Sequence, residues 1–108
     1  MLVELDAFSG KPNPRWELDD VGSDKLRALV AGLSARSEAP TEPAGLGYRG
    51  FICVDGNERF RACRGQVTMP GVVLADPSLQ IERFLLNRLP PDLQELGNRV
   101  AAELQTEG

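Results

Sequence analysis

The sequence predicts a single small α+β domain, in which a mainly antiparallel sheet of four to five short strands carries about three helices on one face. The chain has 108 residues, a length that fits one domain and one hydrophobic core. Apolar residues make up 42% and charged residues 26%, which is ordinary for a folded globular protein. Along the chain, an extended stretch and a helical stretch precede several short extended stretches and two final helical stretches.

The first third of the chain combines a predicted strand pair with a helix. Residues 2–8 alternate between apolar and polar types, which predicts a strand, and 15–18 read as a short return strand that pairs with it. Residues 9–14 contain two prolines and form a loop, since proline cannot donate to a ladder. Asp19 or Asp20 caps a helix that runs to about Arg36. The expected buried stripe of this helix consists of Val21, Leu26, Leu29, Val30 and Leu33.

A β-hairpin is the clearest local prediction. The turn sequence Asp55-Gly56-Asn57-Glu58 separates strands at 48–54 and 59–64, and residues 37–47 before them form a long loop rich in proline and glycine. A two-residue turn places four apolar residues on one face, which are Phe51 opposite Ala62 and Cys53 opposite Phe60. The other face carries Ile52, Val54, Arg59, Arg61 and Cys63. The two thiols therefore fall on opposite faces, where a disulfide between them is difficult to form, whereas a three-residue loop would place both on one face.

The last third reads as a second hairpin followed by two helices. Strands at 66–69 and 72–74 flank the turn residues Pro70-Gly71. Asp76 caps a helix whose first residue is Pro77, and the residues lining that helix are Ile81, Phe84, Leu85 and Leu89. Pro90-Pro91 ends it and opens a last helix, with Leu93, Leu96, Val100 and Leu104 on one face.

Several classes of function are disfavoured by what the sequence lacks. The chain has no histidine, which removes imidazole bases, Ser-His and Cys-His pairs and histidine-bound zinc, and its two cysteines are too few for an all-thiolate zinc site. A net charge of −4 argues against nucleic-acid binding. The longest apolar runs are too short to span a membrane, and the acidic start lacks the features of a signal peptide. We therefore expect a cytoplasmic protein without cofactor, metal, nucleic-acid or membrane partner.

One motif resembles a nucleotide-binding fingerprint but lies in the wrong context. Residues 45–50 spell G-x-G-x-x-G, whose chemistry needs a strand before it and a helix after it, so that the helix N-terminus can hold a pyrophosphate. Here a proline-rich loop comes before and a strand follows. We expect these glycines to let the loop enter the strand.

Two segments are candidates for binding another protein. The loop 8–16 contains Ser9, Lys11, Asn13, Arg15 and Trp16, and its two prolines restrict the backbone. Tryptophan and arginine are the side chains most enriched at binding hot spots. The alternative role of Trp16 is a core side chain in a stiff connector. The hairpin 48–64 is the only basic part of the chain, and Arg59 and Arg61 beside Ile52 and Val54 resemble a docking surface for an acidic protein segment or an anionic ligand. Its alternative role is an ordinary solvated sheet face.

The main hypothesis is therefore a small binding or accessory domain that acts by protein–protein contact through the 8–16 loop, the basic hairpin, or both. The first alternative is a small enzyme or enzyme subunit that uses carboxylates together with Lys11, Tyr48 or Cys63. The second is an inhibitor-like protein that presents the 9–15 loop to a target's cleft.

Overall fold

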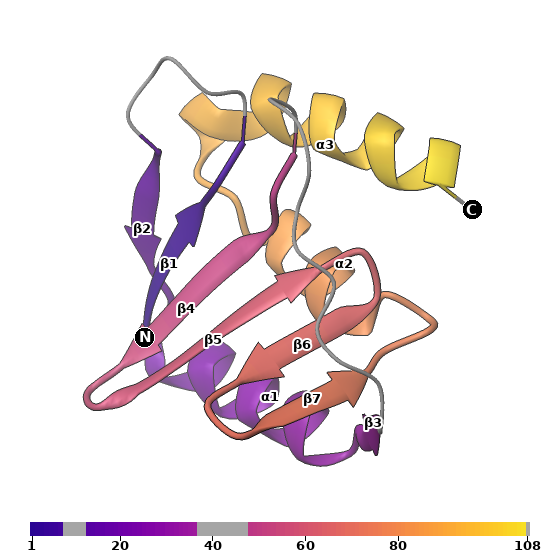
Figure 1. The fold of residues 1–108 in the computed structure, drawn as a ribbon. Helices are drawn as coiled ribbons and strands as arrows, with labels where there is room; N and C mark the ends of the chain where they lie inside the picture. Colours follow the sequence, from indigo (N-terminus) through magenta and orange to yellow (C-terminus); the bar gives the residue numbers. More distant parts are fainter. Residues whose placement is uncertain (8–12, 37–47, 108) are drawn as a thin grey trace.

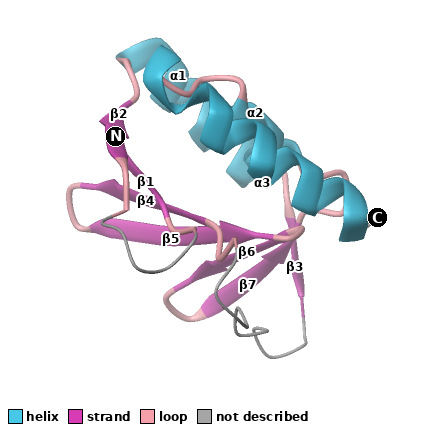
Figure 2. Cartoon of the chain, turned by 90° about the horizontal axis from the view of Figure 1, so that it is seen from above, coloured by secondary structure: helices cyan, strands magenta, loops and turns pink. Residues whose placement is uncertain are grey.

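Residues 1–7, 13–36 and 48–107 are described by the computed structural model, and together they form a seven-stranded antiparallel sheet with helices on one face (Figure 1). Figure 2 shows the two layers from above, with the three helices on the same side of the sheet. The strands are β1 (Leu2–Leu5), β2 (Arg15–Glu17), β3 (Ser34–Arg36), β4 (Phe51–Asp55), β5 (Glu58–Cys63), β6 (Gln66–Met69) and β7 (Val72–Ala75). The helices are α1 (Asp20–Ala31), α2 (Gln80–Leu86) and α3 (Gln94–Glu107), with a 3-10 turn η1 (Pro91–Leu93) before α3.

The sheet order is β2-β1-β4-β5-β6-β7-β3. The predicted α+β class and the helices on one face are confirmed, whereas the prediction of four to five strands is wrong, because the described residues form seven. The predicted return strand is confirmed as β2, in which Trp16 pairs with Val3. The first strand ends at Leu5 rather than residue 8. Beyond it, the Asp6 amide still donates to the Gly50 carbonyl at 2.9 Å.

The central hairpin has the predicted register. Phe51 lies opposite Ala62 and Cys53 opposite Phe60, and all four side chains are buried against the helices. The β4 strand begins at Phe51 rather than residue 48 because Gly50 has a φ of +108°. A Cβ at Gly50 would lie 2.6 Å from the carbonyl oxygen of Ala62. This confirms for Gly50 the expectation that a glycine lets the loop enter the strand; Gly45 and Gly47 lie outside the described residues.

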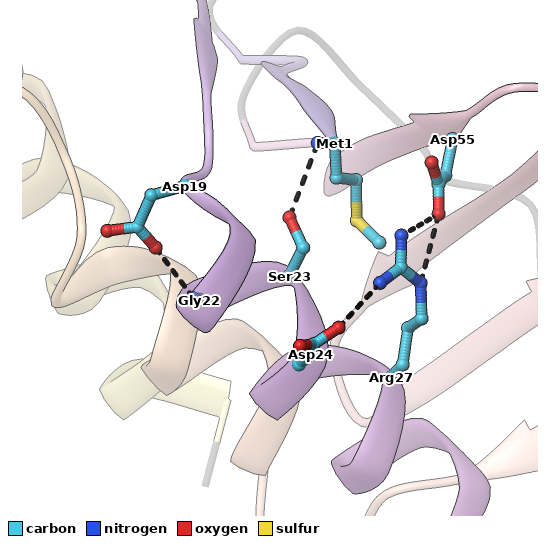
Figure 3. Close-up of polar contacts among 7 residues, drawn as sticks. All are labelled: Met1, Asp19, Gly22, Ser23, Asp24, Arg27 and Asp55. Atoms are coloured by element: carbon cyan, nitrogen blue, oxygen red, sulfur yellow. Dashed lines mark hydrogen bonds and ion pairs between the residues drawn. The ribbon is translucent and has the colours of Figure 1, made fainter.

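The first helix is shorter than predicted. Its N-cap is Asp19, whose Oδ1 accepts a hydrogen bond from the Gly22 amide at 2.6 Å (Figure 3). The helix ends at Ala31 rather than Arg36, because Ser34–Arg36 forms the edge strand β3 paired with β7. Val21 is 64% exposed and does not belong to the buried stripe. At 100° per residue it lies about 140° around the helix from the fully buried Leu26.

The second helix is capped by the predicted acid but begins later than predicted. Asp76 is buried, and its two carboxylate oxygens accept hydrogen bonds from the amides of Gln80 and Ile81 at 3.0 and 2.9 Å. The helix starts at Gln80 rather than Pro77, since Leu79 before it adopts a left-handed conformation with a φ of +57°. Asp76 thus caps α2 although it lies four residues before the first helical residue, Gln80.

The core lies between the sheet and the three helices. Leu26 of α1, Ile81 and Leu85 of α2 and Val100 of α3 pack on the strands, and Leu89 is also buried. Phe84 and Leu96 are partly buried against this cluster, whereas the side chain of Leu104 lies outside the described residues. Among the described helices, none has the length and apolar character needed to cross a membrane.

Candidate functional site

The face of the sheet away from the helices, here called the open face, brings most of the described candidate residues together. The β-sheet register places Arg15, Glu4, Ile52 and Arg61 in one row across four strands. The next row contains Glu17, Leu2, Val54 and Arg59. Charged side chains of β2, β1 and β5 therefore flank apolar side chains of β4, as the hairpin pattern predicted for Ile52 and Val54.

The 13–16 segment contacts the open face through Glu4. Arg15 Nε donates to Glu4 Oε1 at 2.7 Å and Asn13 Nδ2 donates to Oε2 at 3.0 Å, so both carboxylate oxygens are engaged. The Arg15 side chain is 65% exposed, which leaves much of its guanidinium accessible. Two residues of the predicted loop site are thus joined to the sheet.

A second ion pair centres on Asp6. Arg61 Nη1 donates to Asp6 Oδ2 at 3.0 Å and to the carbonyl oxygen of Arg49 at 2.7 Å. The Arg49 Nε lies 3.8 Å from the same carboxylate oxygen. Glu4 and Asp6 are therefore each held by arginine, an arrangement that fixes charge and orientation but does not leave a carboxylate pair poised for acid–base chemistry.

Arg59 differs from the other arginines of the open face. Its side chain is exposed and lies opposite Val54. Within residues 1–7, 13–36 and 48–107 the Arg59 guanidinium makes no hydrogen bond or ion pair, in contrast to the guanidinium groups of Arg15 and Arg61. Its full hydrogen-bonding capacity is available to a partner.

Trp16 lies on the opposite face from the arginines. It pairs with Val3, whose side chain is fully buried, and its ring packs edge-on against Phe51 with ring centroids 6.3 Å apart. Its Nε1 is buried and has no hydrogen-bond partner among the described residues. This placement agrees with the alternative role of Trp16 as a core side chain. Ser9 and Lys11 lie outside the described residues, as do most of the residues of the 9–15 loop.

A buried polar cluster that the sequence did not reveal lies at the end of the sheet near α2. Glu82 is 1% exposed, accepts a hydrogen bond from the Tyr48 hydroxyl, and accepts a second from the Gly65 amide at 2.8 Å. Burial, and then the Glu82 charge, raise the pKa of Tyr48 well above its usual value. Arg64 lies over the Tyr48 ring, 5.5 Å from its centroid, and donates to the Tyr48 carbonyl at 3.2 Å.

Both thiols are poor candidates for a nucleophile. Burial raises the pKa of Cys53 to about 12. Burial, followed by the nearby charge of Glu82, raises the pKa of Cys63 to about 11, despite the opposing effect of Arg64 and Arg61. Since the thiolate is the reactive form, these shifts suppress reactivity at neutral pH.

Within the described part of the chain, no group of histidine, cysteine, aspartate or glutamate side chains is arranged to hold a metal ion. Comparison with protein-family models, with curated proteins and with solved structures gives no match to this chain. The functional proposal that follows therefore starts from the geometry of the open face.

Proposed function

We propose that this chain is a binding module that contacts another protein through the open face of its sheet. The contact centres on Arg59 and Arg61 of β5 and extends to Arg15. The observation that carries the proposal is the exposed Arg59 beside Val54 and Leu2, with no carboxylate partner among the described residues. Arginine next to apolar surface is typical of interface hot spots.

The charge of this face favours an acidic partner. Among the side chains of this face that the structure describes, four arginines (Arg15, Arg49, Arg59 and Arg61) accompany three acids (Glu4, Asp6 and Glu17), which leaves one positive charge in excess. The ion pairs to Glu4 and Asp6 hold Arg15 and Arg61 in place before binding, which lowers the entropy lost on association. An acidic segment that also carries apolar residues would match the arginines of this face and the partly buried Leu2 and Val54 between them, whereas Ile52 is buried and adds little surface.

The enzyme alternative has less support. Tyr48 is fully buried, and the raised pKa of Cys63 disfavours its thiolate. Lys11 lies outside the described residues.

The test compares two charge reversals on opposite sides of the molecule. Arg59→Glu alters the open face, whereas Arg83→Glu makes the same change at an exposed position of α2 and serves as the matched control. Binding of a synthetic peptide that alternates Glu and Val is measured by NMR titration of labelled protein. We expect Arg59→Glu to weaken binding by about fivefold or more and Arg83→Glu to leave it unchanged. Equal binding by all three proteins would refute the proposal.

A further inference from the structure

A recess of about 210 Å³ opens between α1 and the β4–β5 hairpin, on the helix side of the sheet. Its walls include Met1, Val30, Phe60 and Met69, and its rim includes Arg27, Asp55 and Glu58. Arg27 and Glu58 are exposed, whereas Phe60 is buried, so the recess leads from the surface to an apolar floor. This volume exceeds that of an engineered cavity that accepts benzene, about 150 Å³, and falls below the range of about 300–1,000 Å³ typical of drug-sized ligands. It fits one large side chain.

The recess and the side chains next to it carry an excess of negative charge. Arg27 bridges α1 to the hairpin, with hydrogen bonds to Asp24 at 3.0 Å and to Asp55 at 3.0 Å (Figure 3). This pairing lowers the pKa of Asp55, chiefly through the hydrogen bond from Arg27. Two carboxylates line the recess, Asp55 and Glu58, and Asp24 adds a third outside the lining, next to Arg27. Against these three stand the Arg27 guanidinium and the ammonium of Met1, which donates to Ser23 Oγ at 3.3 Å, so one negative charge is in excess around the recess.

The helix end next to the recess also favours a cation. Val30 and Ala31 belong to the last turn of α1, and that turn contains no basic residue. The carbonyl end of a helix carries a partial negative charge that a nearby Lys or Arg normally offsets. The carboxylates of the rim and the end of α1 thus favour positive charge on the same occupant.

The walls favour an aromatic ring. Both methionines of the chain, Met1 and Met69, line the recess. Methionine side chains adapt to the shape of a bound group, and their sulfur atoms make favourable contacts with ring edges. Phe60 adds an aromatic surface at the floor.

We propose that this recess binds one aromatic side chain of a protein partner, flanked by Lys or Arg. This contact is separate from the open face. It lies on the helix side of the sheet and would bind a basic segment, whereas the open face would bind an acidic one. It does not depend on the function proposed above.

The experiment uses methyl-¹³C-methionine protein, because its two methyl signals both report on the recess. The probes are the tripeptides acetyl-Lys-Trp-Lys-amide and acetyl-Glu-Trp-Glu-amide. We expect the basic tripeptide to shift both methyl signals, with the acidic one binding about threefold or more weakly. Glu58→Lys should reduce or reverse this preference, whereas Glu95→Lys, at an exposed position of α3, should preserve it.

A plugging variant separates the recess from other surfaces. Ala31→Phe places a ring at the rim, and Ala28→Phe places the same ring at another exposed position of α1. We expect only Ala31→Phe to abolish the shifts, and Arg59→Glu to bind as wild type does. Equal shifts from both tripeptides, no shifts from either, or shifts that persist in Ala31→Phe would overturn the proposal. Shifts that depend on protein concentration without peptide would overturn it in favour of contact between two copies.

Discussion

Removal of the Tyr48 hydroxyl tests the buried cluster at α2 most directly. In Tyr48→Phe the ring keeps its packing against Phe51, whose centroid lies 5.9 Å away, but the buried Glu82 carboxylate loses a hydrogen-bond donor. Hydrogen bonds to charged groups contribute about 1.5–3 kcal/mol, and Glu82 at 1% exposure has little access to water as a substitute. We expect the free energy of unfolding to fall by that amount, which corresponds to a Tm lower by roughly 6–12 °C.

Urea unfolding followed by circular dichroism measures this loss. Thr68→Val is the control, because the hydroxyl that it removes accepts a long hydrogen bond, 3.5 Å from Gln66 Nε2; it should change stability by less than about 0.5 kcal/mol. The double variant Tyr48→Phe/Glu82→Gln should be less destabilised than the two single variants summed, since both remove the same interaction. If Tyr48→Phe unfolds like wild type, or if the two losses simply add, the hydrogen bond does not stabilise the fold and the reasoning is wrong.

Three further predictions follow from the same structure. Tyr48 is the only tyrosine, so near-ultraviolet difference absorbance should report its ionisation alone, well above pH 10. Because its folded pKa is raised, Tyr48 should leave the free energy of unfolding unaffected up to about pH 10 and lower it above that pH, where only the unfolded chain ionises readily. This loss adds to a decline that starts near about pH 8.5, because the folded pKa values of Cys53 and Cys63 are also raised; Tyr48 ionisation at its ordinary pH would contradict the burial. Gly50→Ala should lower stability by about 2 kcal/mol or more in urea titrations, since its Cβ would collide with the Ala62 carbonyl; a neutral result would show that the strand start tolerates a side chain. Cys63, with a pKa of about 11, should react with iodoacetamide at neutral pH much more slowly in the folded than in the unfolded protein, and equal rates would revive a thiol-based activity.

The local parts of the fold could be predicted from the sequence. The β4–β5 register follows from Gly56-Asn57 and from alternation alone, and the structure reproduces the pairing of Cys53 with Phe60. The capping acids Asp19 and Asp76 were also recognisable, because a cap is specified by residues close in the chain.

The features that were missed depend on distant residues. The β3 strand exists because Ala35 pairs with Leu74 of β7, and nothing near residue 35 indicates that partner. Leu33 continues the helical spacing, which extended the predicted helix too far. Glu82 resembles an ordinary solvent-facing acid of an amphipathic helix, and only the Tyr48 hydroxyl, 34 positions earlier, reveals its burial.

The open face was predicted only in part. The alternation that placed Arg59 and Arg61 together was correct. The acids next to the arginines are Glu4 of β1 and Asp6 directly after it, and β1 pairs with β4 about fifty residues later in the chain. Local patterns cannot show that ladder. They also could not decide the face on which Trp16 lies, because that face is fixed by its pairing with Val3.

The position of β1 inside the sheet has a consequence for how the chain reaches this structure. Val3 pairs with Cys53, which lies fifty positions later in the chain, and Ala35 pairs with Leu74. By contrast, the strands from β4 to β7 each pair with the next strand in the sequence through a tight turn. Closing long loops is slower than closing short ones. We therefore expect the β4–β7 meander to assemble first. During synthesis on the ribosome, β1 should remain unpaired on the side that β4 will occupy until β4 has emerged.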